Sequence, residues 1–294
     1  MILFKADNNQ VISDVDFRKS LEKFNLSGKS VILFSRLFSF GRIQGVHAVQ
    51  KIVEILQECI GEQGSLSIPC YTFSSYKDLV FDVNESKCVV GVLGEFSRHL
   101  PGFIRTTHPI YSHNCWGKYN DILIKQKYTT CFGKNSFYDL FSGLPEPYIL
   151  VLGVGLNTIT NVHYYDQKFS ANSRFLKKFI AKIRVNGVIN EIEFDSFVRK
   201  ENFYKDKVPC LANLDALATD LKIIKRSKLG ENWLHGVNEK DFQKIYQTCL
   251  NQDPEYYLYS SQASYLEYSE KNIFDLFHGS LEPQKIEQIK FLLK

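Results

Sequence analysis

A glycine turn, a run of small polar residues and a histidine–carboxylate pair follow one another in the middle of the chain. Gly153 and Gly155 close a short apolar segment, and glycine permits both a tight turn and a close approach of a ligand to the backbone. His163 and Asp166 are three residues apart, so a helix would place both side chains on one face. This order indicates a functional site; the alternative is a hydrogen-bonded pair on a packed helix.

A second group of polar side chains lies between residues 91 and 112. His108 precedes Pro109, which restricts the backbone of the histidine to extended conformations. Taken alone, a histidine of this kind is more often a hydrogen-bonded structural residue than a catalyst. The functional candidates in this stretch are Glu95, Arg105, Thr106, Thr107, His108 and Ser112.

The elements that must position these side chains alternate between strands and helices. Apolar periodicity and capping residues predict helices at 13–25, 46–60, 91–99, 239–250 and 283–293, and strands at 30–34, 65–69 and 148–152. Asn186-Gly187 predicts a type I′ turn in a hairpin over residues 179–194. We therefore expect an α/β fold in which helices flank a central, mostly mixed sheet, with a β-hairpin and a helical C-terminal part.

The domain organisation follows from the same pattern. Residues 1–195 are expected to form the catalytic core. Residues 196–294 are expected to be a C-terminal part of the same catalytic unit, although the polar stretch 196–235 has little periodicity.

The composition is that of an ordinary globular protein. The 294 residues are 44% hydrophobic and 23% charged, which suffices for a substantial core. No apolar run approaches the roughly 18 residues of a membrane span, and the first residues lack the pattern of a secretory leader. The seven cysteines are scattered without a Cys-x-x-Cys pair, which argues against a zinc site and a disulfide framework. We expect a cytoplasmic protein with no membrane partner.

Positive charge is concentrated in the second half of the chain. Residues 174–228 contain 13 Lys and Arg against 7 Asp and Glu, an excess larger than the net charge of +4 of the whole chain. Such a segment is either a solvated surface or a region that attracts a phosphate-bearing ligand. No nucleic-acid-binding motif accompanies it, so we expect no nucleic-acid partner.

Six ordered patterns within residues 26–175 resemble those of the aminoglycoside 3-N-acetyltransferase family. They are Leu37-x-x-Phe40-Gly41, Gly64-Ser-Leu-x-x-Pro-x-x-Thr72, Gly91-Val-Leu-x-x-x-Phe96, Pro101-Gly102-x-x-Arg105-x-x-His108-Pro109-x-x-Ser112, Phe132-Gly133-x-x-Ser136 and Leu152-Gly153-x-x-x-Asn157-x-x-Thr160-x-x-His163-x-x-Asp166. Each pattern is weak alone, but all six occur in the family's order and at close to its spacing.

The chain departs from the family's patterns at three places. Phe34-Ser35-Arg36 stands where the family has His-x-Ser. Lys134 stands where the family has an acidic residue, and Asp166 replaces a glutamate and has a shorter reach.

The resemblance implies transfer of an acetyl or other short acyl group from acetyl-CoA, or another acyl-CoA, to a primary amine, with no metal. The amine arrives as an ammonium ion and must lose a proton, which a neutral histidine can accept. His163 is the implied base and His108 the competing one, while Asp166 or Glu95 would orient the ring. Thr160 or a nearby backbone N–H would donate to the developing oxyanion.

The resemblance also implies two sets of binding residues. Hydroxyls and backbone N–H groups in the loop 35–41 and at Thr106-Thr107 would hold pantetheine and phosphates. The cofactor-binding candidates are Ser35, Leu37, Phe40, Gly41, Thr106, Thr107, Ser112 and Phe132. The substrate-binding candidates are Thr72, Asn157, Thr160 and Lys134.

The acceptor divides the hypotheses. A polycationic aminoglycoside needs an acidic pocket, whereas this chain is basic and has Lys134 in place of an acid. We therefore favour an amino sugar linked to a nucleotide diphosphate, with a true aminoglycoside N(3)-acetyltransferase that confers antibiotic resistance as the alternative. The protein is expected to be a monomer or a homodimer.

Two more distant alternatives stay open. His108, His113, His163 and Asp166 could bind a metal in a hydrolase, although their spacing fits no standard zinc motif, and a non-catalytic binding protein could share the scaffold. Gly153-x-Gly155 after a strand is part of a dinucleotide fingerprint, but Thr158 occupies the place of its third glycine.

Overall fold

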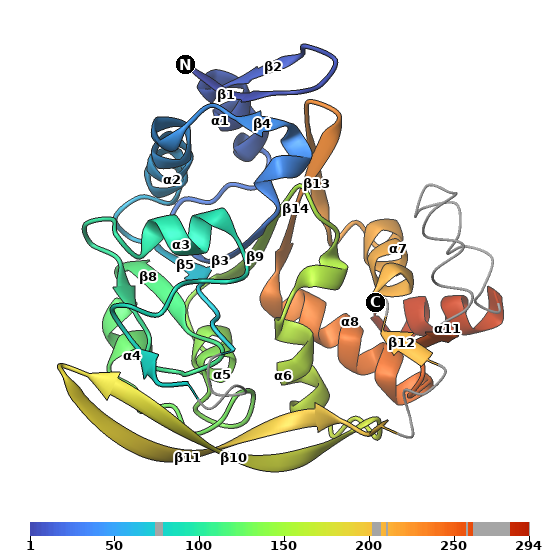
Figure 1. Cartoon of the computed structure of the whole chain (residues 1–294). Coiled ribbons are helices and arrows are strands. Elements are labelled where there is room, and N and C mark those ends of the chain that lie inside the picture. The colour runs from blue at the N-terminus through green and yellow to red at the C-terminus, as the bar shows by residue number, and fades with distance from the viewer. Residues whose placement is uncertain (74–78, 202–206, 210, 257, 261–282, 294) are drawn as a thin grey trace.

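A seven-stranded mixed sheet forms the centre of the molecule (Figure 1). The computed structural model describes residues 1–73, 79–201, 207–209, 211–256, 258–260 and 283–293. The strands of the central sheet are β3 (Ser30–Ser35), β5 (Ser65–Pro69), β7 (Ile104–Arg105), β8 (His113–Gly117), β9 (Pro147–Leu152), β13 (Lys225–Leu229) and β14 (Asn232–Asn238). Their order across the sheet is β13-β14-β9-β3-β5-β8-β7. The predicted α/β fold with a mixed central sheet is confirmed.

The three middle strands are parallel and buried. β3 pairs with both β5 and β9 in parallel register, and every residue of β5 and β9 is buried. Side chains of β3 alternate between the two faces, as the pleat requires. Val31 and Leu33 belong to one core cluster, and Ile32 and Phe34 to the other. A strand covered on both faces has a continuous apolar sequence, which explains why these strands are recognisable in the sequence.

Helices cover both faces of the sheet (Figure 1). The helices α1 (Asp14–Glu22), α2 (Val46–Ile60) and α3 (Val92–Ser97) contribute buried residues to one cluster. The helices α4 (Asn120–Ile124), α5 (Phe137–Ser142), α6 (Asn161–Lys168), α7 (Ala212–Asp220), α8 (Glu239–Gln252) and α11 (Pro283–Leu293) contribute to the other. Among the described residues no helix has the length and apolar character needed to cross a membrane.

The predicted start of the first helix is confirmed in detail. Ser13 caps α1 with its hydroxyl, which accepts a hydrogen bond from the backbone N–H of Asp16 at 3.2 Å. The Asp16 carboxylate accepts in turn from the backbone N–H of Ser13 at 2.8 Å, completing a capping box. The helix ends at Glu22, a few residues before the predicted end.

The predicted hairpin is present and longer than expected. The strands β10 (Arg174–Val185) and β11 (Val188–Arg199) pair along their full length, and Figure 1 shows them as a long curved ribbon below the helices. Asn186 and Gly187 both have positive φ, at 50° and 81°, as a type I′ turn requires. The short strand β6 (Phe81–Asp82) adds to β10 in parallel. The hairpin brings Arg174 and Arg199, at its open end, next to each other.

Several elements have no counterpart in the sequence predictions. α7 and β13 lie in the stretch 196–235, which has little periodicity, and β14 begins in it; β14 pairs antiparallel with β9 in the central sheet. The remaining elements of the described residues are the short strands β1 (Ile2–Lys5), β2 (Val11–Ser13), β4 (Arg42–Ile43), β12 (Lys207–Pro209) and β15 (Leu258–Ser260), and the 3-10 helices η1 (Leu37–Phe40) and η3 (Leu156–Thr158).

Gly153 holds the end of β9 against the loop that follows β3. Its φ is 69°, and a Cβ atom there would meet Ser39 Oγ, the Phe40 ring at 2.8 Å and the Arg36 carbonyl oxygen at 2.9 Å. Gly153→Ala should therefore cost well over the roughly 1–2 kcal/mol of a left-handed conformation, because backbone as well as side chains must move. Urea unfolding measures the loss.

Gly28→Ala is the matched control for this substitution. Gly28 has a similar φ of 74°, but nothing lies within 4 Å of its added Cβ. Equal destabilisation by the two substitutions would show that the close approach at Gly153 is absent.

Candidate active site

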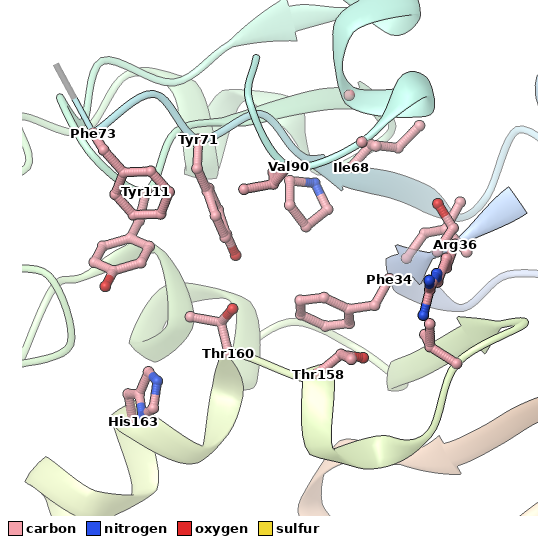
Figure 2. Close-up of a pocket in the computed structure, with 16 residues that line it drawn as sticks. Phe34, Arg36, Ile68, Tyr71, Phe73, Val90, Tyr111, Thr158, Thr160 and His163 are labelled. Atoms are coloured by element: carbon pink, nitrogen blue, oxygen red, sulfur yellow. The ribbon is translucent and has the colours of Figure 1, made fainter. Parts of the chain in front are cut away.

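A pocket of about 470 Å³ opens at the carboxyl ends of the middle strands (Figure 2). Such an edge is the usual place for a ligand in an α/β sheet. Its walls come from the ends of β3 and β5, the start of α3, and the segment from β9 to α6; the lining side chains include Phe34, Arg36, Tyr71, Val90, Thr160 and His163. Figure 2 shows Arg36 and His163 on opposite sides of the view, with Phe34 and Tyr71 between them.

His163 and Asp166 lie on one face of α6, as their spacing predicts. The distance from His163 Nδ1 to Asp166 Oδ2 is 3.6 Å, and 26% of the histidine side chain is exposed. The Asp166 carboxylate is buried and accepts a hydrogen bond from the Tyr246 hydroxyl at 2.5 Å. The structure therefore brings an imidazole edge to the pocket and a fixed carboxylate beneath it.

Arg174 completes this buried cluster. Its Nε lies 2.7 Å from Asp166 Oδ2, and its Nη2 lies 2.9 Å from His163 Nδ1. Its Nη1 donates to the Phe197 carbonyl oxygen at 3.0 Å, so the guanidinium is held by β11 as well. A buried carboxylate needs such a partner, because an isolated charge is costly to remove from water.

The environment favours a neutral imidazole and an ionised carboxyl. Burial lowers the pKa of His163, and the charges of Arg174 and Arg199 act in the same direction, while Asp166 opposes them. Burial alone would raise the pKa of Asp166, but His163 and Arg174 outweigh it and lower this pKa overall. A neutral histidine beside an anionic carboxylate is the state that a general base needs.

A second, smaller compartment of about 140 Å³ lies on the other side of His163. It shares Thr158, Thr160 and His163 with the larger pocket, and its other lining residues are Ile159, Val162, Asp166, Arg174, Arg199, Leu211 and Tyr246. Among these residues, Arg174 and Arg199 carry guanidinium groups and Asp166 carries a carboxylate. His163 therefore stands between a larger pocket and a small polar compartment.

Two hydroxyl-bearing side chains, Tyr71 and Thr160, line the larger pocket. The Tyr71 hydroxyl makes a hydrogen bond with the Tyr138 hydroxyl, at 2.5 Å between the oxygens. Burial raises the pKa of Tyr71, so its hydroxyl stays protonated and able to donate. Figure 2 shows the Tyr71 hydroxyl directed toward Phe34 and Thr160. Thr160 was predicted from the sequence; Tyr71 was not.

The structure does not bring His108 or Glu95 to the pocket wall. His108 is buried, and its Nδ1 accepts hydrogen bonds from the backbone N–H groups of Ile110 and Tyr111 at 3.1 and 3.0 Å. Burial lowers its pKa to about 3. Glu95 pairs with Arg98 at 2.8 Å and accepts from the Cys88 N–H; the Arg98 hydrogen bond lowers the carboxyl pKa to about 2. Both side chains have partners that fix loops around the site.

One of the predicted cofactor-binding residues lines the larger pocket, and the other seven lie away from it. Ser35 lines the larger pocket. Leu37, Phe40 and Phe132 are buried in the core, with the Phe132 ring centred 5.3 Å from that of His163. Gly41 packs against the backbone of Lys5. The other three, Thr106, Thr107 and Ser112, do not line the pocket; buried Thr106 accepts from the His113 N–H, and buried Ser112 accepts from Arg105.

The predicted substrate-binding residues are also spread out. Thr160 lines both cavities. Thr72 donates to the Pro109 carbonyl oxygen at 2.7 Å, and Lys134 is exposed before α5, outside both lining sets. The backbone of Asn157 lies in η3, but its side chain is outside the described residues.

Several polar lining residues were not predicted as functional, among them Tyr71, Arg174 and Arg199. Arg174 and Arg199 belong to the basic segment 174–228, but no sequence spacing predicts that they lie near His163. Tyr246 lies on the apolar face of α8 and reads as a core residue in the sequence. No group of three or more His, Cys, Asp or Glu side chains in the described ranges is arranged to hold a metal ion.

Comparison with known proteins identifies the family. Residues 32–251 match the family model described as aminoglycoside 3-N-acetyltransferase, and the chain belongs to this family. It is therefore an enzyme of the N-acetyltransferase class with acetyl-CoA as co-substrate, as the sequence patterns imply. No curated protein matches the sequence.

Solved structures share the fold at low sequence identity. Aminoglycoside acetyltransferase AAC(3)-IIb has a TM-score of 0.72 at 17% identity, covering 82% of this chain and 97% of that one. AAC(3)-Xa has a TM-score of 0.71 at 19% identity, covering 84% and 94%. AAC-IIIb, solved as a binary complex with CoASH, has a TM-score of 0.68 at 16% identity, covering 82% and 96%.

Buried neutral histidines around the site predict acid lability. Burial lowers the pKa of His108 to about 3 and that of His235 to about 4, against about 6.5 in the unfolded chain. Between these values the unfolded state binds more protons, so stability should fall as pH falls below about 6.5. Each histidine contributes up to about 1.4 kcal/mol per pH unit.

His108→Asn tests this origin, because the asparagine oxygen can replace Nδ1 as the acceptor for the two N–H groups without taking up a proton. Urea titrations at several pH values give the slope of the unfolding free energy against pH. In this variant the slope should be smaller by about 1.4 kcal/mol per pH unit, the effect of one proton. The substitution His47→Ala, at an exposed position, should leave the slope unchanged. An unaltered slope in His108→Asn would exclude His108 as the source.

Proposed function

We propose that this family member transfers the acetyl group of acetyl-CoA to the amine of an amino sugar that carries an anionic group, with His163 as the proton acceptor. The observation that carries the proposal is the position of His163 between the two cavities, one large enough for an acyl donor arm and one lined by guanidinium groups. A base at that position reaches ligands from both sides.

The larger pocket suits the arm of an acyl-CoA. Its volume of about 470 Å³ lies within the usual range for small-molecule sites. Phe34, Ile68 and Val90 give it apolar walls, and the exposed Arg36 at its rim offers a charge to phosphates. When bound, acetyl-CoA supplies an acetyl group already activated as a thioester. The CoASH-bound neighbour of the same fold supports this assignment.

His163 removes the proton that the attacking amine must lose. Its lowered pKa keeps the ring neutral near pH 7, and its exposed edge faces the pocket. To accept a proton at Nε2, the neutral ring must carry its other proton on Nδ1, where Asp166 is the acceptor. The carboxylate then stabilises the imidazolium that forms.

The Tyr71 and Thr160 hydroxyls are suited to the oxyanion. Both are donors that face the pocket within reach of one another, and they are positioned before any ligand binds. A donor fixed in this way requires no reorganisation during the reaction and contributes about 3–4 kcal/mol to the transition state. The predicted role of Thr160 is therefore proposed again, now with Tyr71 as its partner.

The small compartment favours an anionic acceptor over a polycation. Arg174 and Arg199 line it, and the one carboxylate in its lining, Asp166, already pairs with Arg174. A nucleotide-linked amino sugar carries phosphates that guanidinium groups recognise. An aminoglycoside carries several ammonium groups that the same field repels. Acetylation of an aminoglycoside, the activity that names the family, remains the second candidate.

The first test of the proposal is removal of the base. His163→Ala should lower kcat about 100- to 10,000-fold, the usual contribution of a general base, and leave the Kd for acetyl-CoA nearly unchanged. Thiol release measures turnover and calorimetry measures the Kd. His108→Asn is the matched comparison and should retain most of its activity. Full activity of His163→Ala would mean that another group, or the departing thiolate, takes the proton.

The second test concerns the acceptor. We expect a higher kcat/KM for a nucleotide-linked amino sugar than for a kanamycin-like amine, and a smaller advantage as salt screens the charges. Arg199→Gln should reduce this preference, whereas Lys134→Gln should not, because Lys134 lies outside both lining sets. Efficient acetylation of the aminoglycoside, with no turnover of any nucleotide-linked amino sugar, would restore the antibiotic-modifying function.

A further inference from the structure

Arg174 contacts both Asp166 and His163, at the point where a simple histidine–carboxylate pair would make a direct hydrogen bond. Its Nε and Nη2 contact the two side chains at 2.7 and 2.9 Å, whereas Nδ1 and Oδ2 of the pair are 3.6 Å apart. Only 5% of the arginine side chain is exposed. The guanidinium therefore competes with the imidazole for the carboxylate.

The contact of Arg174 with His163 determines where the neutral ring carries its proton. A guanidinium has only donors, so Nδ1 must present a lone pair to Nη2. The single proton of the neutral ring is then on Nε2, and this nitrogen can donate into the pocket but cannot accept a proton. General-base catalysis at Nε2 needs the opposite tautomer, in which Nδ1–H faces Asp166.

Arg174 is also within reach of a ligand. It lines the small compartment together with Arg199, on the side of His163 away from the larger pocket. An anion bound there would attract Nη2, and a turn of Arg174 toward it would exchange the Nη1 hydrogen bond to Phe197 for one to the anion while Nε stays near Asp166. Release of Nδ1 lets the ring exchange its proton through solvent, from Nε2 to Nδ1, where Asp166 accepts it. Binding of an anion in the small compartment is thereby coupled to the tautomer of His163.

We propose that Arg174 sets the tautomer of His163, and that an anionic group of the acceptor, bound in the small compartment, draws Arg174 aside and allows the ring to act as a base. This inference rests on the proposed acetyl transfer to an anionic acceptor. Arg174 is a positioning residue in this scheme, since it acts through His163. It makes the anionic group a requirement for proton removal as well as for binding.

Three charged groups and one tyrosine surround His163, and they come from four elements. Asp166 lies on α6, Arg174 on β10 and Arg199 on β11, and Tyr246 on α8 contacts Asp166. Loss of the Arg174 charge would leave Asp166 as the nearest charge, which stabilises the imidazolium. The acidic limb of kcat/KM should therefore move to higher pH in Arg174→Met and stay close to wild type in Arg174→Lys.

Nitrogen-15 NMR of the histidine rings tests the tautomer without any acetyl transfer. The full chain is labelled, and His163→Gln assigns the ring signals. Near pH 7.5 the free protein should show the Nε2–H form, and inorganic phosphate should convert it to Nδ1–H. We expect a change in tautomer ratio of about tenfold or more, the usual effect of a hydrogen bond to a charged group. An Nδ1–H form in the free protein, or no response to phosphate, would overturn the inference.

Variants separate the coupling from simple structural support. Arg174→Met should show Nδ1–H with or without phosphate. If this variant does not fold, Arg174→Lys serves instead, because an ammonium cannot contact both partners in the same geometry and should lose part of the phosphate response. An unchanged Nε2–H form in the variant that folds would contradict the proposal.

Kinetics gives an independent readout. Phosphate added to the wild type should raise kcat for an amino sugar without its own phosphate and leave its KM nearly unchanged, and this activation should be lost in the Arg174 variant. Acetate is the second arm and identifies whether any small anion suffices. If no amine is acetylated, the proposed function fails, whereas the NMR result still decides the role of Arg174.

Discussion

The buried ion pair between Asp166 and Arg174 is the interaction on which the site depends. It joins α6, which carries the histidine, to the first residue of β10, where the long hairpin begins. Neither charge could be buried without the other, because an unpaired buried charge costs several kcal/mol. The Tyr246 hydroxyl donates to the carboxylate and the Phe197 carbonyl oxygen accepts from the guanidinium, so helix, hairpin and α8 meet around one carboxylate.

The sheet determines where this cluster meets a ligand. β3, β5 and β9 run parallel and end at the same edge, and the backbone N–H of Arg36 donates to the Leu152 carbonyl oxygen at 2.9 Å, which ties two of these ends together. The pocket at this edge has apolar walls near Phe34 and polar groups toward α6. The hairpin then closes the far side of His163 and creates the small arginine-lined compartment. Two cavities that share one imidazole follow from this arrangement.

The parts of the fold that were predictable are those whose sequence records burial locally. The strand at 30–34 is mostly apolar because both faces are covered, the strand at 65–69 is bounded by Gly64 and Pro69, and α2 has a continuous apolar stripe. β14 was missed because its centre reads His235-Gly236. The glycine is needed there, since a Cβ atom would lie 2.5 Å from the Phe24 ring and from the Tyr148 hydroxyl. Similarly, β13 carries lysines because it is an edge strand.

The residues of the site also divide into those that local sequence predicts and those that it does not. His163 and Asp166 were found because a spacing of three residues brings them together within one helix. Arg174 and Tyr71 reach the site through tertiary contacts that no spacing encodes. His108 shows the opposite effect, since its pattern resembles a functional motif while its ring is buried and caps a loop.

Calorimetric titration of CoA tests most directly whether the larger pocket binds the acyl donor. Val90 is 38% exposed and lines the pocket, whereas its neighbour Val89 is 59% exposed and is not among the lining residues. The account predicts that CoA binds to the wild type and to Val89→Trp without added metal, and that Val90→Trp loses this binding because the indole fills the cavity. Absence of binding to the wild type at millimolar CoA, or equal binding to both variants, would contradict it.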